Sequence, residues 1–151
     1  MLVSKERVMK RENTKQKIIE TALTLFSERG YDAVSVGEIA EAVGIKAPSL
    51  YNHYPSKQAI FDAIVETTAL QYEKDTGRID TIGEEELFEK VRQIFDYSLH
   101  NDNIRKFRKM MTIEQFRSPS LGELYTRRFS ERLVDYHAEI FRSLIAAGVI
   151  Y

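Results

Sequence analysis

Residues 35–57 read SVGEIAEAVGIKAPSLYNHYPSK and contain the start and end signals of two short helices. Ser35 stands three residues before Glu38, which is the spacing of a capping box, so a helix is expected to begin after Ser35. Gly44 can adopt the left-handed conformation that ends helices, which limits this helix to barely two turns. A helix this short is stable only when it packs against a neighbour.

The second short helix differs from an ordinary core helix. Pro48 is tolerated in a first helical turn and Pro55 ends the element, so it spans about 47–53. Leu50 is its one strongly apolar residue, and we assign Leu50 and Tyr54, four positions apart, to the core. Two short helices joined at a glycine indicate a helix-turn-helix, although a plain helical bundle with a short corner has the same signals.

Helical periodicity continues on both sides of this unit. Apolar residues recur at three and four positions between Thr14 and Gly30, which predicts a preceding helix. Ser56 can cap a long following helix that reaches 72–75. Further helices are predicted from Glu84 to about 99, over 110–116, and from Ser120 to about 148; the first and last of these start with the capping-box pairs Thr81–Glu84 and Ser120–Glu123.

The composition agrees with an all-α protein. The 151 residues include only seven Gly and three Pro, and 43% are hydrophobic, which is enough to form a buried core. There is no Cys, which excludes disulfides and thiolate zinc sites and fits a reducing cytoplasm. Apolar runs stay far below the roughly 20 residues of a membrane helix, so we expect no membrane span.

The net charge of −1 hides an uneven distribution. Basic residues concentrate in the first 17 positions, so we assign 1–13 as a basic N-terminal arm, either a minor-groove arm or a solvated tail. The chain has three His, and none lies at a helical metal-binding spacing. The acidic residues at 84–86 fit a solvated helix start. We therefore expect no enzyme activity, no metal and no cofactor.

Several linked blocks resemble the tetracycline-repressor (TetR/AcrR) family over about 14–60. They are FSERGY at 26–31, VGEIA at 36–40, VGI at 43–45 and LYNHYPSK at 50–57. The resemblance implies a helix-turn-helix DNA-binding domain at 14–57, which a long fourth helix joins to an effector-binding and dimerisation domain at 58–151. It further implies a homodimer that represses from a palindromic double-stranded DNA operator until a small-molecule effector releases it.

The site residues follow from the resemblance and from the chemistry of the grooves. The family pattern implies phosphate contacts by Tyr51, His53 and Lys57, and Ser35 at a helix N-terminus is a further backbone anchor. Lys46 departs from the Ser or Thr common at its position. Base edges are the expected targets of Lys46, Ala47, Pro48, Ser49 and Asn52.

An effector pocket is the expected feature of the later helices, because Met and aromatic side chains fit irregular apolar ligands. The candidates are Phe95, Phe107, Met110, Met111, Phe116, Tyr125, Phe129 and His137. An ordinary core position is the alternative for each. Family members carry further helices beyond the position of Gly148, so we expect the sequence to be incomplete there, or the helix after Ser120 to form the dimer. An interaction protein that no longer binds DNA is the alternative function, and the polar face at 46–57 argues against it.

Overall fold

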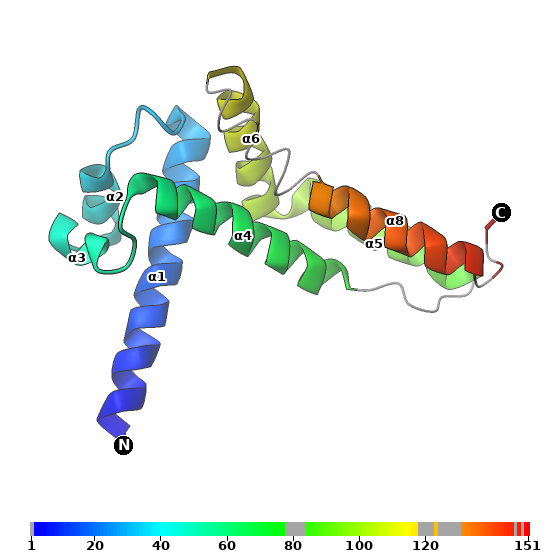
Figure 1. Ribbon diagram of the computed structural model, residues 1–151, viewed down its shortest axis with the longest axis horizontal. Helices are drawn as coiled ribbons and strands as arrows, with labels where there is room; N and C mark the ends of the chain where they lie inside the picture. Colours follow the sequence, from blue (N-terminus) through cyan, green and yellow to red (C-terminus); the bar gives the residue numbers. More distant parts are fainter. Residues whose placement is uncertain (1, 78–83, 118–122, 124–130, 147, 149) are drawn as a thin grey trace.

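The computed structural model describes residues 2–77, 84–117, 123, 131–146, 148 and 150–151. The helices are α1 (Leu2–Arg29), α2 (Val36–Val43), α3 (Ala47–Tyr51), α4 (Lys57–Thr76), α5 (Glu84–His100), α6 (Asp102–Arg117) and α8 (Glu131–Ala146). The described part of the chain is all-helical, which confirms the predicted fold class. The short helices α2 and α3 lie at one end of the molecule, and α5 and α8 lie at the other (Figure 1).

The first helix begins earlier than its predicted start near Thr14. No Gly or Pro occurs between Leu2 and Arg29, and most of the added residues are good helix formers, so the segment 2–13 continues α1. This end of α1 projects beyond the other helices (Figure 1). The segment predicted as a basic arm is therefore helical from Leu2 onwards, in contrast to the alternative of a solvated tail.

Three aromatic rings mark the centre of the core. Phe26 of α1 lies 5.3 Å from the Tyr31 ring and 6.4 Å from the Phe61 ring of α4, between ring centres. Leu50 of α3 is fully buried, as predicted, and Tyr54 is partly buried against the same cluster. The cluster continues into α6 through Phe107, Met110 and Met111. The helix-turn-helix and α6 therefore share one core.

Helix α6 is longer than the segment 110–116 that the sequence predicts. Asn101 separates α5 from α6, as predicted. Its side-chain oxygen accepts a hydrogen bond from the Ile104 amide at 3.1 Å and so caps α6. The basic residues after it are the first turns of the helix. Thr81 and Ser120, which should cap α5 and the last helix, lie outside the described residues. No helix in the described ranges combines the length and apolar character needed to cross a membrane.

Candidate nucleic-acid interface

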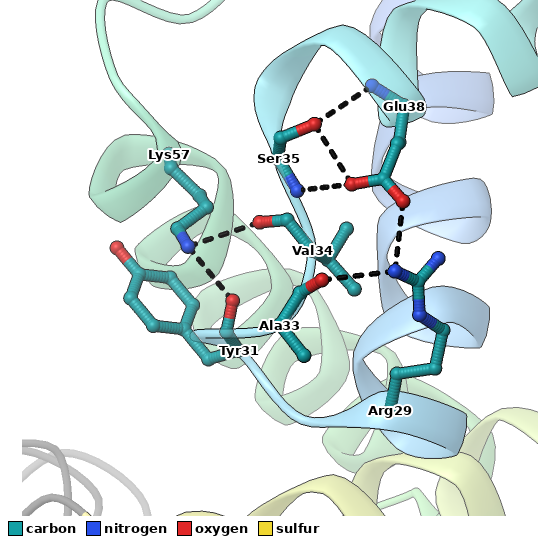
Figure 2. A network of polar contacts seen from close by, with 7 residues as sticks. All are labelled: Arg29, Tyr31, Ala33, Val34, Ser35, Glu38 and Lys57. Carbon is teal, nitrogen blue, oxygen red and sulfur yellow. Dashed lines mark hydrogen bonds and ion pairs between the residues drawn. The ribbon is translucent and has the colours of Figure 1, made fainter.

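The start of α2 has the capping box that the sequence predicts. Ser35 Oγ accepts a hydrogen bond from the Glu38 amide at 3.2 Å, and the Ser35 amide donates to Glu38 Oε2 at 2.8 Å (Figure 2). Arg29, at the end of α1, forms a 2.7 Å ion pair with Glu38 Oε1 and donates to the Ala33 carbonyl at 2.9 Å. These bonds fix the entry of α2 relative to α1.

Lys57 joins the same turn from the start of α4. Its ammonium donates to the Tyr31 carbonyl at 2.8 Å and to the Val34 carbonyl at 3.0 Å (Figure 2). It also lies 4.2 Å from the centre of the Tyr31 ring. An ammonium has three donors, so one N–H remains for a further acceptor. Lys57 therefore ties α4 to the α1–α2 turn in addition to any contact it makes with phosphate.

Helix α3 ends at Tyr51, two residues before its predicted end. Both the His53 and the Tyr54 amides donate to the Leu50 carbonyl, at 2.8 and 3.0 Å, and this closes the helix in a tight turn. Asn52 and His53 therefore stand in the turn after α3. At the other end, Lys46 is the N-cap and its side chain makes no capping bond.

The helical arm of α1 runs beside this turn. Arg11 Nη2 donates to the Asn52 carbonyl at 3.4 Å. Lys10, Arg11 and Thr14 line a shallow hollow together with Asn52 and His53. Burial lowers the pKa of His53, and the nearby positive charges of Arg11 and Lys15 lower it further. The hollow thus combines cations with hydrogen-bonding groups, a combination suited to an anion.

The structure brings all nine predicted DNA-binding residues onto α3, its flanking turns and the starts of α2 and α4. Lys10 and Arg11 of α1, which the sequence analysis assigned to the basic arm, lie beside Asn52 and His53. The absence of Gly and Pro from residues 2–29 could have indicated their position. In one continuous helix, these basic residues align with the apolar stripe of α1.

The predicted pocket residues in the described part of the chain differ in burial. Phe107, Met110 and Met111 belong to the shared core, whereas Phe95 and Phe116 are largely exposed, and His137 is half-buried. Tyr125 and Phe129 lie outside the described residues. A cleft of about 290 Å³ lies between α1, α4 and the α5–α6 junction, lined in part by Glu20, Thr68, Asp75 and Tyr97. No cluster of metal-ligating side chains occurs in the described part of the chain.

The capping box makes the stability of the protein depend on pH. Hydrogen bonds from Ser35, helped by Arg29, lower the pKa of Glu38 from 4.5 to about 2. Because the folded pKa is depressed, the stabilisation is present above pH 4.5 and is lost as the pH falls towards about 2. Glu38→Gln should therefore be less stable than the wild type at neutral pH, and this difference should shrink at pH 3.

Urea unfolding at pH 7, 4.5 and 3 measures this effect. Glu41→Gln removes another carboxylate of α2 without touching the capping box, and it should leave the acid-dependent loss in place. A difference between Glu38→Gln and the wild type that stays constant across these pH values would contradict the assignment.

Comparison with known proteins supports a regulatory role for this surface. Residues 18–64 match the model of the bacterial regulatory proteins of the tetR family. A segment of 51 residues is 51% identical to the HTH-type negative transcriptional regulator IcaR of the biofilm operon icaADBC in Staphylococcus aureus. The match covers 34% of this chain and 27% of that protein, so the chain spans about a quarter of the length of this curated relative.

Solved structures resemble the fold over nearly the whole chain. A TetR-family regulator from Mesorhizobium loti aligns with a TM-score of 0.71 and 26% identity, covering 91% of this chain and 71% of the other. GusR of Salmonella enterica aligns with a TM-score of 0.74 and 22% identity, covering 92% and 71%. The family model, the Staphylococcus aureus relative and the Mesorhizobium loti structure are all described as regulators, whereas the likeness to GusR concerns the fold alone.

Proposed function

We propose that the chain is a DNA-binding transcriptional regulator of the tetR family that acts as a repressor, because residues 18–64 match the family model. The observation that carries the proposal is α3, a helix of five residues whose one buried side chain is Leu50. Pro48, Ser49 and Tyr51 are exposed, and the side chains at positions 46–53 include donors and acceptors for base edges. The name of the Staphylococcus aureus relative, a negative regulator, favours repression.

In this proposal α3 enters the major groove of a double-stranded operator. Lys46 can donate to the acceptors of guanine, and Asn52 can pair with adenine. Ala47 and Pro48 can contact a thymine methyl group, and Ser49 can bond to either kind of base. These residues determine which sequence is preferred.

Phosphate contacts then fix affinity and register. Ser35 presents the N-terminus of α2, and Tyr51 is half-exposed beside the proposed groove contacts. His53 and Lys57 are the other two phosphate contacts predicted from the sequence. Arg11, at the hollow between α1 and the α3–α4 turn, adds a cation to it.

The helices after the DNA-binding domain at 14–57 would bind the effector and form the homodimer. Large apolar side chains are exposed on two of these helices: Phe88, Phe95 and Leu99 of α5, and Val134, Phe141 and Ile145 of α8. Contiguous exposed apolar surface marks interaction sites, and a homodimer is the partner that a palindromic operator requires. We assign 14–57 to DNA binding and 58–151 to effector binding and dimerisation, with the protein acting in the cytoplasm.

Selection from a random double-stranded DNA library tests the function directly. The wild-type protein should enrich a palindromic site, and nuclease protection should show two half-sites whose centres lie roughly 34–36 Å apart. Failure to enrich any sequence at moderate salt would contradict the repressor proposal. It would favour the alternative of an interaction protein that keeps the fold but does not bind DNA.

Binding of variants to the selected duplex distinguishes contacts to bases from contacts to phosphates. Asn52→Ala should cost about 1–3 kcal/mol on the selected site and change the preferred base at one position. Arg11→Ala should weaken selected and scrambled duplexes alike and reduce the salt slope by about one. Fluorescence anisotropy titrations at three salt concentrations measure both effects. A uniform loss for Asn52→Ala would instead make Asn52 a backbone anchor.

A further inference from the structure

Glu114 is a buried carboxylate on an otherwise apolar face of α6. Its exposed fraction is 0%, and it lies on the helix one turn after Met110 and Met111. Its Oε1 accepts a hydrogen bond from the Tyr31 amide at 2.7 Å, across 83 residues of sequence. Its Oε2 is buried without a hydrogen-bond partner among the described residues. A charge held in this way is costly for folding, because desolvation is only partly offset.

The peptide that Glu114 binds also holds the start of α4. The Tyr31 amide donates to Glu114, while the Tyr31 carbonyl accepts from the Lys57 ammonium at 2.8 Å. The Tyr31 ring packs on Phe26 and Phe61 in the shared core. Helix α6, the α1–α2 turn and the first residue of α4 are therefore linked in series through Tyr31.

The close approach of α6 to this turn depends on a glycine. Gly30 has φ +86°, and a Cβ there would lie 3.2 Å from Glu114 Oε1 and 3.3 Å from Ile113 Cγ2. One turn further along α6, Arg117 Nη1 donates to the Arg29 carbonyl at 3.4 Å. Two side chains of α6 thus bind backbone atoms on either side of Gly30, and α6 rests directly on the turn.

We propose that Glu114 is a positioning residue for DNA binding, which holds the α1–α2 turn so that α2 and α3 keep the orientation needed to read DNA. A displacement of α6 would then be transmitted to the turn and to Lys57 through a direct polar bond as well as through packing. A methionine at 114 would continue the apolar face without a buried charge, but it would leave the Tyr31 amide without this acceptor. The inference rests on the proposed function.

Two substitutions separate positioning from folding. Glu114→Met keeps the side-chain volume and removes both the buried charge and the acceptor of the Tyr31 amide; these two effects on stability oppose each other, so the variant should still unfold cooperatively from a helical folded state. Its affinity for the duplex selected by the wild-type protein should nevertheless fall, by roughly 5- to 150-fold. Glu114→Gln keeps an oxygen that can accept from the Tyr31 amide and should restore most of the affinity. Glu139→Met, at an exposed site on α8, is the control and should bind as the wild type does.

Hydrogen exchange provides a readout that needs no DNA. The Tyr31 amide should exchange about tenfold or more faster in Glu114→Met than in the wild type or in Glu114→Gln. Wild-type affinity of Glu114→Met for the selected duplex would overturn the inference, as would unchanged exchange at Tyr31 or a failure of Glu114→Gln to restore binding. A wild-type protein that enriches no DNA would overturn the proposed function itself, a result that the exchange experiment distinguishes.

Discussion

Leu50→Ala is expected to lower the free energy of unfolding by about 2–5 kcal/mol and to abolish binding to the selected duplex. Helix α3 has five residues, far fewer than an isolated helix needs in water, and Leu50 is its one buried side chain. Its carbonyl also closes the turn by accepting from the His53 and Tyr54 amides. Removing this anchor leaves a cavity in the core and frees the helix that reads DNA.

The neighbouring residue provides a matched control. Tyr51 is half-exposed, so Tyr51→Ala should change stability by no more than about 0.5 kcal/mol while it weakens DNA binding through a lost phosphate contact. Urea unfolding followed by circular dichroism, together with anisotropy on the same samples, compares the two variants. If Leu50→Ala retained wild-type stability, the docking of α3 through this side chain would be wrong.

The features that the sequence predicts well are those decided by near neighbours in the chain. The capping box of Ser35 and Glu38 needs only their spacing of three, and it forms as predicted. Gly44 ends α2 with φ +82°, the conformation that glycine adopts most readily. The burial of Leu50 follows from its being the one strongly apolar residue in a polar segment. Local signals of this kind are sufficient to predict α2, α3 and the burial of Leu50.

The features that the sequence does not predict depend on partners far along the chain. Nothing near Lys57 shows that its ammonium would bind carbonyls 23 and 26 residues earlier. The bond from Arg11 to the Asn52 carbonyl likewise requires that α1 and the α3–α4 turn meet. Glu114 does leave a trace, because a carboxylate in an apolar helical stripe is unusual, but its partner becomes visible only in the fold.

The effector pocket shows a different limit of sequence analysis. Apolar periodicity identifies Phe107, Met110 and Met111 as inward-facing, and they are buried. The same pattern is produced by a cavity wall and by a packed core, because both favour large apolar side chains. In this fold α6 packs on α1 and α4, and its apolar face fills the shared core. Which helix covers a face therefore decides whether that face can bind a ligand.

Lys57→Met is expected to affect both folding and DNA binding. The substitution keeps most of the aliphatic stem and removes two hydrogen bonds from an ammonium to the Tyr31 and Val34 carbonyls, at 2.8 and 3.0 Å. Hydrogen bonds to charged groups contribute about 1.5–3 kcal/mol, so we expect a loss of stability in this range. If the third donor of the ammonium reaches a phosphate, as we propose, the salt slope of DNA binding also falls by about one.

Lys17→Met is the control for the structural part of this effect. Lys17 also donates from its ammonium to a backbone carbonyl, that of Val43 at 2.9 Å, but it is not among the proposed phosphate contacts. It should therefore lower stability and leave the salt slope unchanged. A stability loss without a change of slope in Lys57→Met would show that the ammonium acts only within the protein. The anchor at the start of α4 would then act by orienting α3, and the phosphate contacts would be left to Arg11, Tyr51 and His53.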